Sequence, residues 1–436
     1  HDVRLTMGGE PTFVSSEDRE SPQWDTHADG PEKRALSADL ILKLKEVFGK
    51  GGLIHHGQGK WYPGEPLPRW QYTLYWRKDG QAIWQNPTYL AQLQENYQFN
   101  HQHAGLFIQE LAKFLNINPN NAQPAYEDVF YFLWEEGNLP VNIDPLNVDL
   151  KDSLERKTLS ELLEQGLNNP KGFIIPIQWN YFNQRWLSCA WQFRRQHLFL
   201  TPGNSPIGLR LPLESLPYQV PAQRQQPAPR SPFEEVGNLG EFHEKVKQRY
   251  DQEVDESIPE ALLNPKAYES SEEEEENKNP FFPVKEEKEE VNQYEPSYRL
   301  FTIKTALCVE AREGKIYIFM PPVDYLEHYL DLLASIEATA QKLNMPVIIE
   351  GYEPPKDSRL EKMMVSPDPG VIEVNIHPAK NWAEVVYNYD QLFEAARQCH
   401  LSAEKFMLDG RHTGTGGGNH ITIGGAQASD SPLLRR

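Results

Sequence analysis

Three polar side chains that could bind a metal ion follow residue 370 in regular alternation. Glu373, Asn375 and His377 alternate with isoleucine and valine. Since successive side chains on a strand point to opposite faces, the three polar groups are expected to share one face, with neighbours roughly 6.6 Å apart. That spacing lets them share one ion or flank two. We therefore expect the three polar groups to face an open cleft and the intervening aliphatic side chains to be buried.

A glycine-rich segment follows at residues 409–425. Glycines permit positive φ and a close approach of the backbone to a ligand, and this segment contains Gly414, Gly416, Gly417 and Gly418. The polar residues that flank them are Asp409, Arg411, His412, Asn419 and His420. Backbone N–H groups here could approach a phosphate or acyl group while Arg411 neutralises its charge. We interpret the segment as a site loop that leads into a short strand at 421–423.

Two further regions carry polar groups that could reach the same site. Glu10 lies at the Gly-Gly break of a strand expected over 5–14, and Glu350 ends a strand expected over 346–351. Between residues 51 and 70, glycines, prolines and aromatic residues could hold polar side chains rigidly, as a substrate loop requires. Those side chains are His55, His56, Lys60, Glu65 and Arg69. Because the two histidines are adjacent, on a strand they would face opposite ways, and at most one would reach a site.

These residues must be positioned by a mixture of helices and strands. Apolar stripes indicate helices at 31–48, 323–343 and 382–408, and the apolar run at 129–134 is typical of a buried strand. Several short strands separated by turns complete the pattern, which predicts an α+β fold with a predominantly antiparallel sheet and flanking helices. Neither GxGxxG nor GxxxxGK[ST] occurs, which disfavours a dinucleotide-binding fold or a P-loop.

Composition suggests a domain division and excludes some classes of protein. The net charge is −20, and residues 234–295 hold 20 acidic against 7 basic residues. We interpret 220–297 as an acidic, proline-rich and largely disordered linker or insertion, with one helix near 241–249, between parts 1–219 and 298–436. No basic stripe suggests nucleic-acid binding, and no apolar run reaches the length of a membrane helix. Three widely spaced cysteines favour a reducing cytoplasm.

Four long motifs resemble one bacterial family of amidoligases, whose members are often fused to a transglutaminase-like domain. The motifs are GGEPTF at 8–13, GQGKWYPGE at 57–65, GVIEVNIHP at 370–378 and LDGRHTGTGGGNH at 408–420. The resemblance covers about residues 1–215 and 298–436. The family is in turn distantly similar to the glutamine synthetase and glutamate–cysteine ligase fold.

That resemblance implies an ATP-dependent carboxylate–amine ligase that forms an amide or peptide bond through an acyl phosphate. It implies ATP and Mg²⁺ or Mn²⁺ as cofactors, and a carboxylate and an amine, small or peptidic, as substrates. The expected metal ligands are Glu10, Glu373, His420, Glu350 and His377. Lys60, Arg69 and Arg411 are expected to contact phosphate or substrate carboxylate, and the remaining substrate and nucleotide contacts are expected from Glu65, His56, Asn375, the four glycines and Asn419.

Two alternatives remain open from the residues. A metallohydrolase could use His377, His412 and His420 as zinc ligands without ATP. A non-catalytic module could bind a peptide or carboxylate without nucleotide turnover. The arginine and glutamate motifs that complete such ligase sites lie beyond residue 436 in the family, so we expect this chain to be a fragment that is inactive alone.

Overall fold

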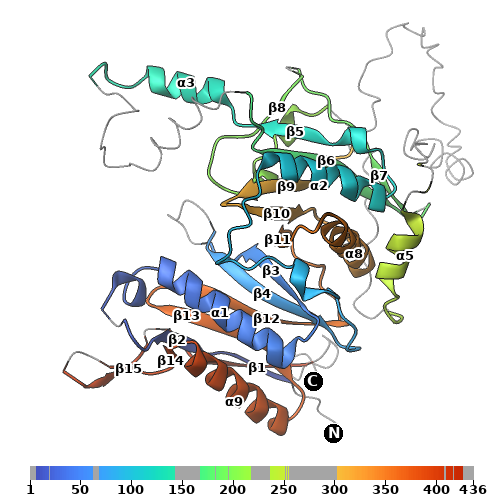
Figure 1. Cartoon of the computed structure of the whole chain (residues 1–436). Coiled ribbons are helices and arrows are strands. Elements are labelled where there is room, and N and C mark those ends of the chain that lie inside the picture. The colour runs from blue at the N-terminus through green and yellow to red at the C-terminus, as the bar shows by residue number, and fades with distance from the viewer. Residues whose placement is uncertain are drawn as a thin grey trace, which may run out of the picture. The chain divides into compact units, whose positions relative to one another are not determined.

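The chain forms two compact units, each assembled from segments distant in sequence (Figure 1). The first comprises His1–His103, Arg230–Gln248 and Glu310–Arg436, and the second comprises Ala104–Pro229 and Arg249–Val309. The computed structural model describes residues 6–18, 20–61, 68–142, 167–181, 183–194, 196–217, 236–250, 252, 254, 302–406, 409–415 and 417–425. Most of the predicted linker lies outside these residues, but the helix expected near 241–249 is present as α5 (Phe242–Arg249). The division into 1–219, 220–297 and 298–436 stays a prediction.

The sheet of the first unit is mostly antiparallel and takes strands from both ends of the sequence. Its strands are β1 (Thr6–Glu10), β2 (Thr12–Ser15), β3 (Leu53–Gln58), β4 (Trp70–Arg77), β10 (Lys315–Met320), β11 (Val347–Gly351), β12 (Leu360–Asp368), β13 (Val371–Ala379), β14 (Leu401–Ser402) and β17 (His420–Gly424). Their order is β14, β2, β13, β12, β4, β3, β11, β10, and β1 pairs with both β13 and β17. The β3–β11 and β11–β10 pairs are parallel, whereas the pairs from β14 to β3 are antiparallel.

Helices α1 (Pro31–Phe48) and α9 (Trp382–Gln398) cover one face of this sheet. Pro31 suits the first turn of α1 because its missing N–H needs no partner there. The Asn381 side chain caps α9 by accepting a hydrogen bond from the backbone N–H of Glu384 at 2.9 Å. The side chains that form the core between helices and sheet include Phe13, Leu40, Ile41, Leu44, Val365, Ile372, Val374 and Leu392. The opposite face of β12 and β13 therefore carries the alternate, polar side chains.

The first unit also contains a third long helix, α8 (Leu326–Leu343), which is buried along much of its length. It ends at Asn344, whose φ of 53° is left-handed and closes the last turn. A small two-stranded sheet pairs β15 (Lys405–Phe406) with β16 (His412–Thr413) ahead of the glycine-rich segment.

In the second unit, the described residues form a smaller set of strands beside the α-helices α2 and α3. Its elements are α2 (His101–Phe114), β5 (Gln123–Tyr126), α3 (Val129–Gly137), β6 (Gly172–Asn180), β7 (Arg185–Ser188), β8 (Leu198–Phe199) and β9 (Ala306–Arg312). The order is β9, β6, β5, β8, and β7 pairs with β6. Residues of α2 and β9 lie on both sides of the unit boundary.

The α+β class with a mostly antiparallel sheet is confirmed, but two element predictions are wrong. Residues 129–134 form the helix α3, because Asp128 caps it by accepting from the N–H of Tyr131, and a short apolar run alone does not distinguish a helix from a strand. Helix α9 ends at Gln398, well before 408, because His400 is left-handed with a φ of 54°. Among the described helices, none is both long and apolar enough to cross a membrane.

Candidate functional site

Strand β13 presents Glu373 and Asn375 on the face that α1 and α9 leave uncovered. The intervening Ile372 and Val374 are fully buried in the core on the other face. The Glu373 side chain is only 7% exposed, and its Oε1 accepts a hydrogen bond from Nδ2 of Asn375 at 2.9 Å. The predicted common face therefore holds for these two residues.

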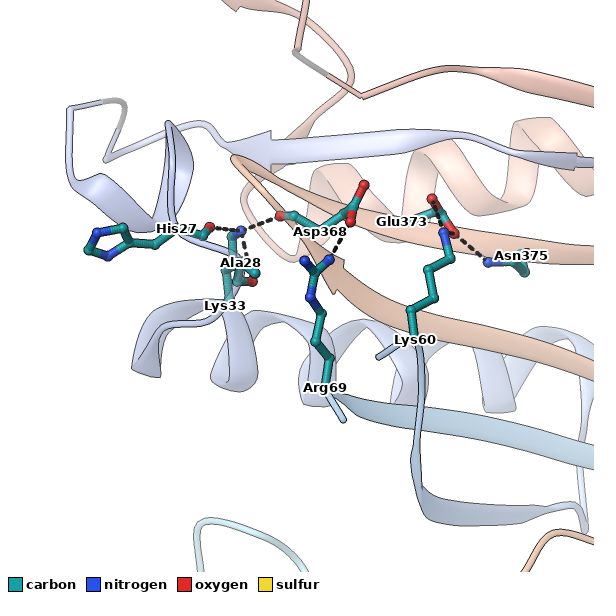
Figure 2. Close-up of polar contacts among 8 residues, drawn as sticks. All are labelled: His27, Ala28, Lys33, Lys60, Arg69, Asp368, Glu373 and Asn375. Atoms are coloured by element: carbon teal, nitrogen blue, oxygen red, sulfur yellow. Dashed lines mark hydrogen bonds and ion pairs between the residues drawn. The ribbon is translucent and has the colours of Figure 1, made fainter. Parts of the chain in front are cut away.

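A lysine reaches this carboxylate from the end of β3. The Lys60 ammonium donates to Oε1 and Oε2 of Glu373 at 2.8 and 3.0 Å (Figure 2). Its backbone is fixed by two ladder bonds, from Gly59 N–H to the Arg69 carbonyl at 2.6 Å and from Arg69 N–H to the Lys60 carbonyl at 3.0 Å. The hairpin of β3 and β4 thus brings Lys60 and Arg69 to the same edge of the site, and their contact with phosphate or substrate carboxylate stays a prediction.

Arg69 and Lys33 hold the turn that leads into β13. The Arg69 guanidinium pairs with the Asp368 carboxylate. The Lys33 ammonium donates to the backbone carbonyls of Asp368 at 2.7 Å, His27 at 2.9 Å and Ala28 at 3.2 Å (Figure 2). Burial lowers the pKa of Lys33 to about 8. These contacts fix the β12–β13 turn close to Glu373. The sequence reasoning missed Lys33 and Asp368, and the Pro-Asp-Pro-Gly turn at 367–370 was the available signal.

The glycine-rich segment lies against the same face. Thr12, which is opposite Glu373 in the β2–β13 register, bonds through Oγ1 to Thr415 Oγ1 at 3.0 Å, and its N–H donates to Asn419 Oδ1 at 2.9 Å. A Cβ at Gly417 would be 2.8 Å from Thr12 Cγ2 and 3.0 Å from Val371 Cγ2. A residue with a side chain would push the backbone away, so glycine is required for this approach. Gly414, by contrast, has no atom within 4 Å of a Cβ position.

Glu10 and His420 form a pair beside this loop. They are opposite each other in the β1–β17 register, and His420 Nδ1 is 3.3 Å from Glu10 Oε2. Glu373 lies opposite Thr12, and Thr12 is two residues after Glu10 in the chain. Among the residues that the structure describes, no three His, Cys, Asp or Glu side chains come close enough to hold a metal together. The structure thus pairs two of the three predicted ligands, and their convergence with Glu373 on one ion stays a prediction.

His377 is not on the Glu373 face, which corrects the prediction. Its ring packs edge-on against Phe48 of α1 and Trp76 of β4, and its Nε2 is 3.2 Å from Nδ2 of Asn388 on α9. The register between β1 and β13 shifts between Gly9 and Met7, where an extra residue enters β13, and such a bulge reorients the next side chain. Burial lowers the pKa of His377.

The three histidines of the metallohydrolase alternative therefore do not meet within the described residues. His377 packs against the two helices, His412 contacts Phe406 in the small β15–β16 sheet, and His420 pairs with Glu10.

His56 and Glu350 also lie on the helix side of the sheet. The row Asn375, Met364, Thr73, His55 crosses four neighbouring strands in register, so His55 shares the Glu373 face and His56 faces the other way. Glu350 is opposite His56 and pairs with Arg312. Burial raises the pKa of Glu350 to about 7 and lowers that of His56 to about 3. These two residues are thus separated from Glu373 by the sheet itself.

Of the remaining predicted residues, those that the structure describes are not assembled around Glu373. The Arg411 side chain is 79% exposed and pairs with Asp409 two residues earlier. The ring of His420 fills the space that a Cβ at Gly418 would occupy, 2.6 Å from its Cε1. Glu65 and Gly416 lie outside the described residues.

Comparison with known proteins gives one family. No curated protein and no solved structure matches the chain. A family model described as "Putative amidoligase enzyme (DUF2126)" matches residues 1–436. This match spans both units and includes every residue of the site described above, and the chain accordingly belongs to that amidoligase family.

Proposed function

We propose that this chain is an ATP-dependent carboxylate–amine ligase that uses the Glu373 face of the sheet. The observation that carries the proposal is a buried carboxylate, Glu373, held by Lys60 beside a backbone loop that only glycine permits at Gly417. Membership of the amidoligase family supports the ligase class. In the reaction, a carboxylate oxygen of one substrate attacks the γ-phosphorus of ATP and ADP leaves. The amine then attacks the acyl carbon, phosphate leaves and the amine loses a proton.

The chain's cations would act on the charge that moves in these steps. Lys60 can turn from Glu373 to a phosphate oxygen, because its side chain is 42% exposed and therefore has room to move. Arg69 is 8% exposed and held by Asp368, so its role is to fix the turn and contribute positive potential rather than to move. Preorganised positive groups of this kind stabilise charge that develops in phosphoryl transfer.

The types of donor present match those that a divalent cation of the kind that ligases require would use, although no three of them converge among the described residues. Mg²⁺ is usually bound by one or two carboxylates, with water and substrate phosphates completing its shell. Glu10 offers such a carboxylate, His420 adds a nitrogen that Mn²⁺ accepts more readily than Mg²⁺, and Glu373 is a further carboxylate on the neighbouring strand. Bound there, the ion would polarise the phosphate and neutralise its charge.

Trapping of an acyl phosphate with hydroxylamine tests this proposal. The full-length protein that contains this chain is incubated with ATP, Mg²⁺ or Mn²⁺, hydroxylamine and a panel of amino acids and peptides, and hydroxamate and ADP are measured. We expect both products in equal amounts, with loss of both in Glu373→Gln. The matched control is Glu361→Gln, which removes a carboxylate from β12 that pairs with Lys78 at 3.0 Å. Equal turnover in the two variants would contradict the role of Glu373, and ligand binding without ADP formation would favour the non-catalytic binding module.

A further inference from the structure

A pocket of about 480 Å³ lies in the first unit on the helix-covered face of the sheet. One wall is α1 and the other is the segment 87–94, while strands β3, β4 and β11 form the floor. Small-molecule sites typically have volumes of about 300–1,000 Å³. The sheet separates this pocket from the Glu373 face, so it is not part of the proposed ligase site.

The lining is mainly apolar. Ile54 and Ile348 lie in the floor, Ile41 and Leu42 come from α1, and Leu90 belongs to the opposite wall. Such a surface favours a ligand with an apolar body, because water released from both surfaces stabilises the complex.

Lys45 is a partly buried cation in the lining. Within the described part of the chain, Lys45 makes no ion pair, and burial lowers the pKa of its ammonium group, which the carboxylate of Glu337 offsets in part without forming an ion pair with it. Of the acidic residues in the lining, Glu46 pairs with Lys43 at 3.8 Å, and Asp39 accepts a hydrogen bond from the neutral amide of Gln94 at 3.2 Å. A partly buried charge without a counter-charge is costly, so an anion is the ligand group that Lys45 would stabilise.

A neutral histidine provides a second polar group. His56 lines the floor with its ring edge-on to Tyr72, 5.0 Å between centroids. Among the described residues, neither of its ring nitrogens makes a hydrogen bond. A neutral imidazole offers one donor and one acceptor, so His56 can bind a hydroxyl group on a ligand without adding charge.

We propose that this pocket binds a small monocarboxylate with an apolar or aromatic body, with its carboxylate paired to Lys45. A single negative charge fits because Lys45 is the partly buried lysine of the lining and makes no ion pair among the described residues; Lys50 also lines the pocket but is exposed to water. The body lies over Ile54 and Ile348, and a hydroxyl on that body would reach His56.

Calorimetric titration of the full chain with three isosteric probes tests the charge preference. The probes are 3-phenylpropanoate, 3-phenylpropan-1-ol and 3-phenylpropylamine. We expect affinity to fall in that order. Lys45→Met should lower the affinity for the carboxylate probe by about tenfold, the loss expected for one charge-assisted contact. The affinity for the alcohol probe should not change. Lys78→Met, which removes another partly exposed lysine of the same unit that lies outside the pocket, is the control and should bind like the wild type.

A second variant makes the test independent of Lys45. Leu42 lines the wall and is 49% exposed, so Leu42→Asp should fold normally and repel the carboxylate probe more than the alcohol. Thermal unfolding checks that each variant is folded. The proposal is overturned if no probe binds at millimolar concentration, if the amine binds as tightly as the carboxylate, or if Lys45→Met and Lys78→Met bind the carboxylate equally.

Discussion

Lys33 offers a quantitative test of how the site is held together. Its ammonium group is fully buried and donates to three backbone carbonyls, of which one belongs to the turn before Glu373 and two precede α1. Lys33→Met keeps the length of the side chain but leaves these three acceptors without their donor. Each buried acceptor left unpaired costs about 1–3 kcal/mol, and the relief of burying a charge offsets part of this. We expect a net loss of about 3 kcal/mol in the free energy of unfolding at pH 7.

The pH dependence of that difference follows from the pKa of Lys33. Burial lowers it from 10.5 to about 8, so between these values the unfolded chain binds the proton more tightly than the folded chain. Stability rises with pH wherever the unfolded state binds more protons. The wild type should therefore gain up to about 3 kcal/mol relative to Lys33→Met between pH 8 and 10.5.

Urea unfolding monitored by tryptophan fluorescence, together with hydrogen exchange of peptides covering 25–48 and 360–380, measures both effects. Lys43→Met is the control, because Lys43 lies on the same helix, is 45% exposed and pairs only at 3.8 Å with Glu46, and surface pairs contribute about 0–1 kcal/mol. The reasoning would be refuted if Lys33→Met lost no more unfolding free energy than Lys43→Met. It would also be refuted if the stability difference between the wild type and Lys33→Met became smaller between pH 8 and 10.5.

Two further predictions concern the glycine-rich loop and His55, which is fully buried on the Glu373 side of the sheet. Gly417→Ala should displace the glycine-rich segment, because the new Cβ would overlap Thr12 and Val371, whereas the Cβ of Gly414→Ala meets nothing within 4 Å. We expect faster proteolysis of the segment in Gly417→Ala but not in Gly414→Ala. Equal rates of proteolysis in the two variants would contradict this prediction. Burial lowers the pKa of His55 from 6.5 to about 4, so the unfolded chain is protonated first as the pH falls, and up to about 3 kcal/mol of stability is lost between pH 6.5 and 4. His55→Leu should flatten that part of the urea-midpoint profile, and an unchanged slope would show that His55 does not cause it.

Local patterns predicted side-chain orientation correctly where the strand is regular. The alternation that placed Glu373 and Asn375 on one face and Ile372 and Val374 on the other is a property of the strand alone. It failed at His377 because the bulge depends on how β1 pairs with β13, and that pairing joins residues more than 360 positions apart. No local pattern carries this information.

The assignment of residues to one site failed for a related reason. His55 and His56 were correctly expected to face opposite ways, but the sequence contains no signal for which of them faces Glu373. The answer depends on the register that connects β3 through β4 and β12 to β13. Glu350 lies on the helix side as well, because it is opposite His56 in the register between β11 and β3. Local composition identified these residues as candidates, but only the strand order and register determine on which face of the sheet each one lies.

The interleaved strand order has a consequence for how the protein is made. In the first unit, β2 pairs with β13 and β4 pairs with β12. Strands β2 and β4 therefore cannot form these pairs until about 300 further residues have been synthesised. Chain synthesis at about 5–20 residues per second puts that delay at tens of seconds. During this interval β2 and the outer edge of β4 expose unpaired backbone groups, which can pair with other chains. Nascent chains stalled before β12 should therefore aggregate or recruit chaperones, whereas chains released after β13 should not.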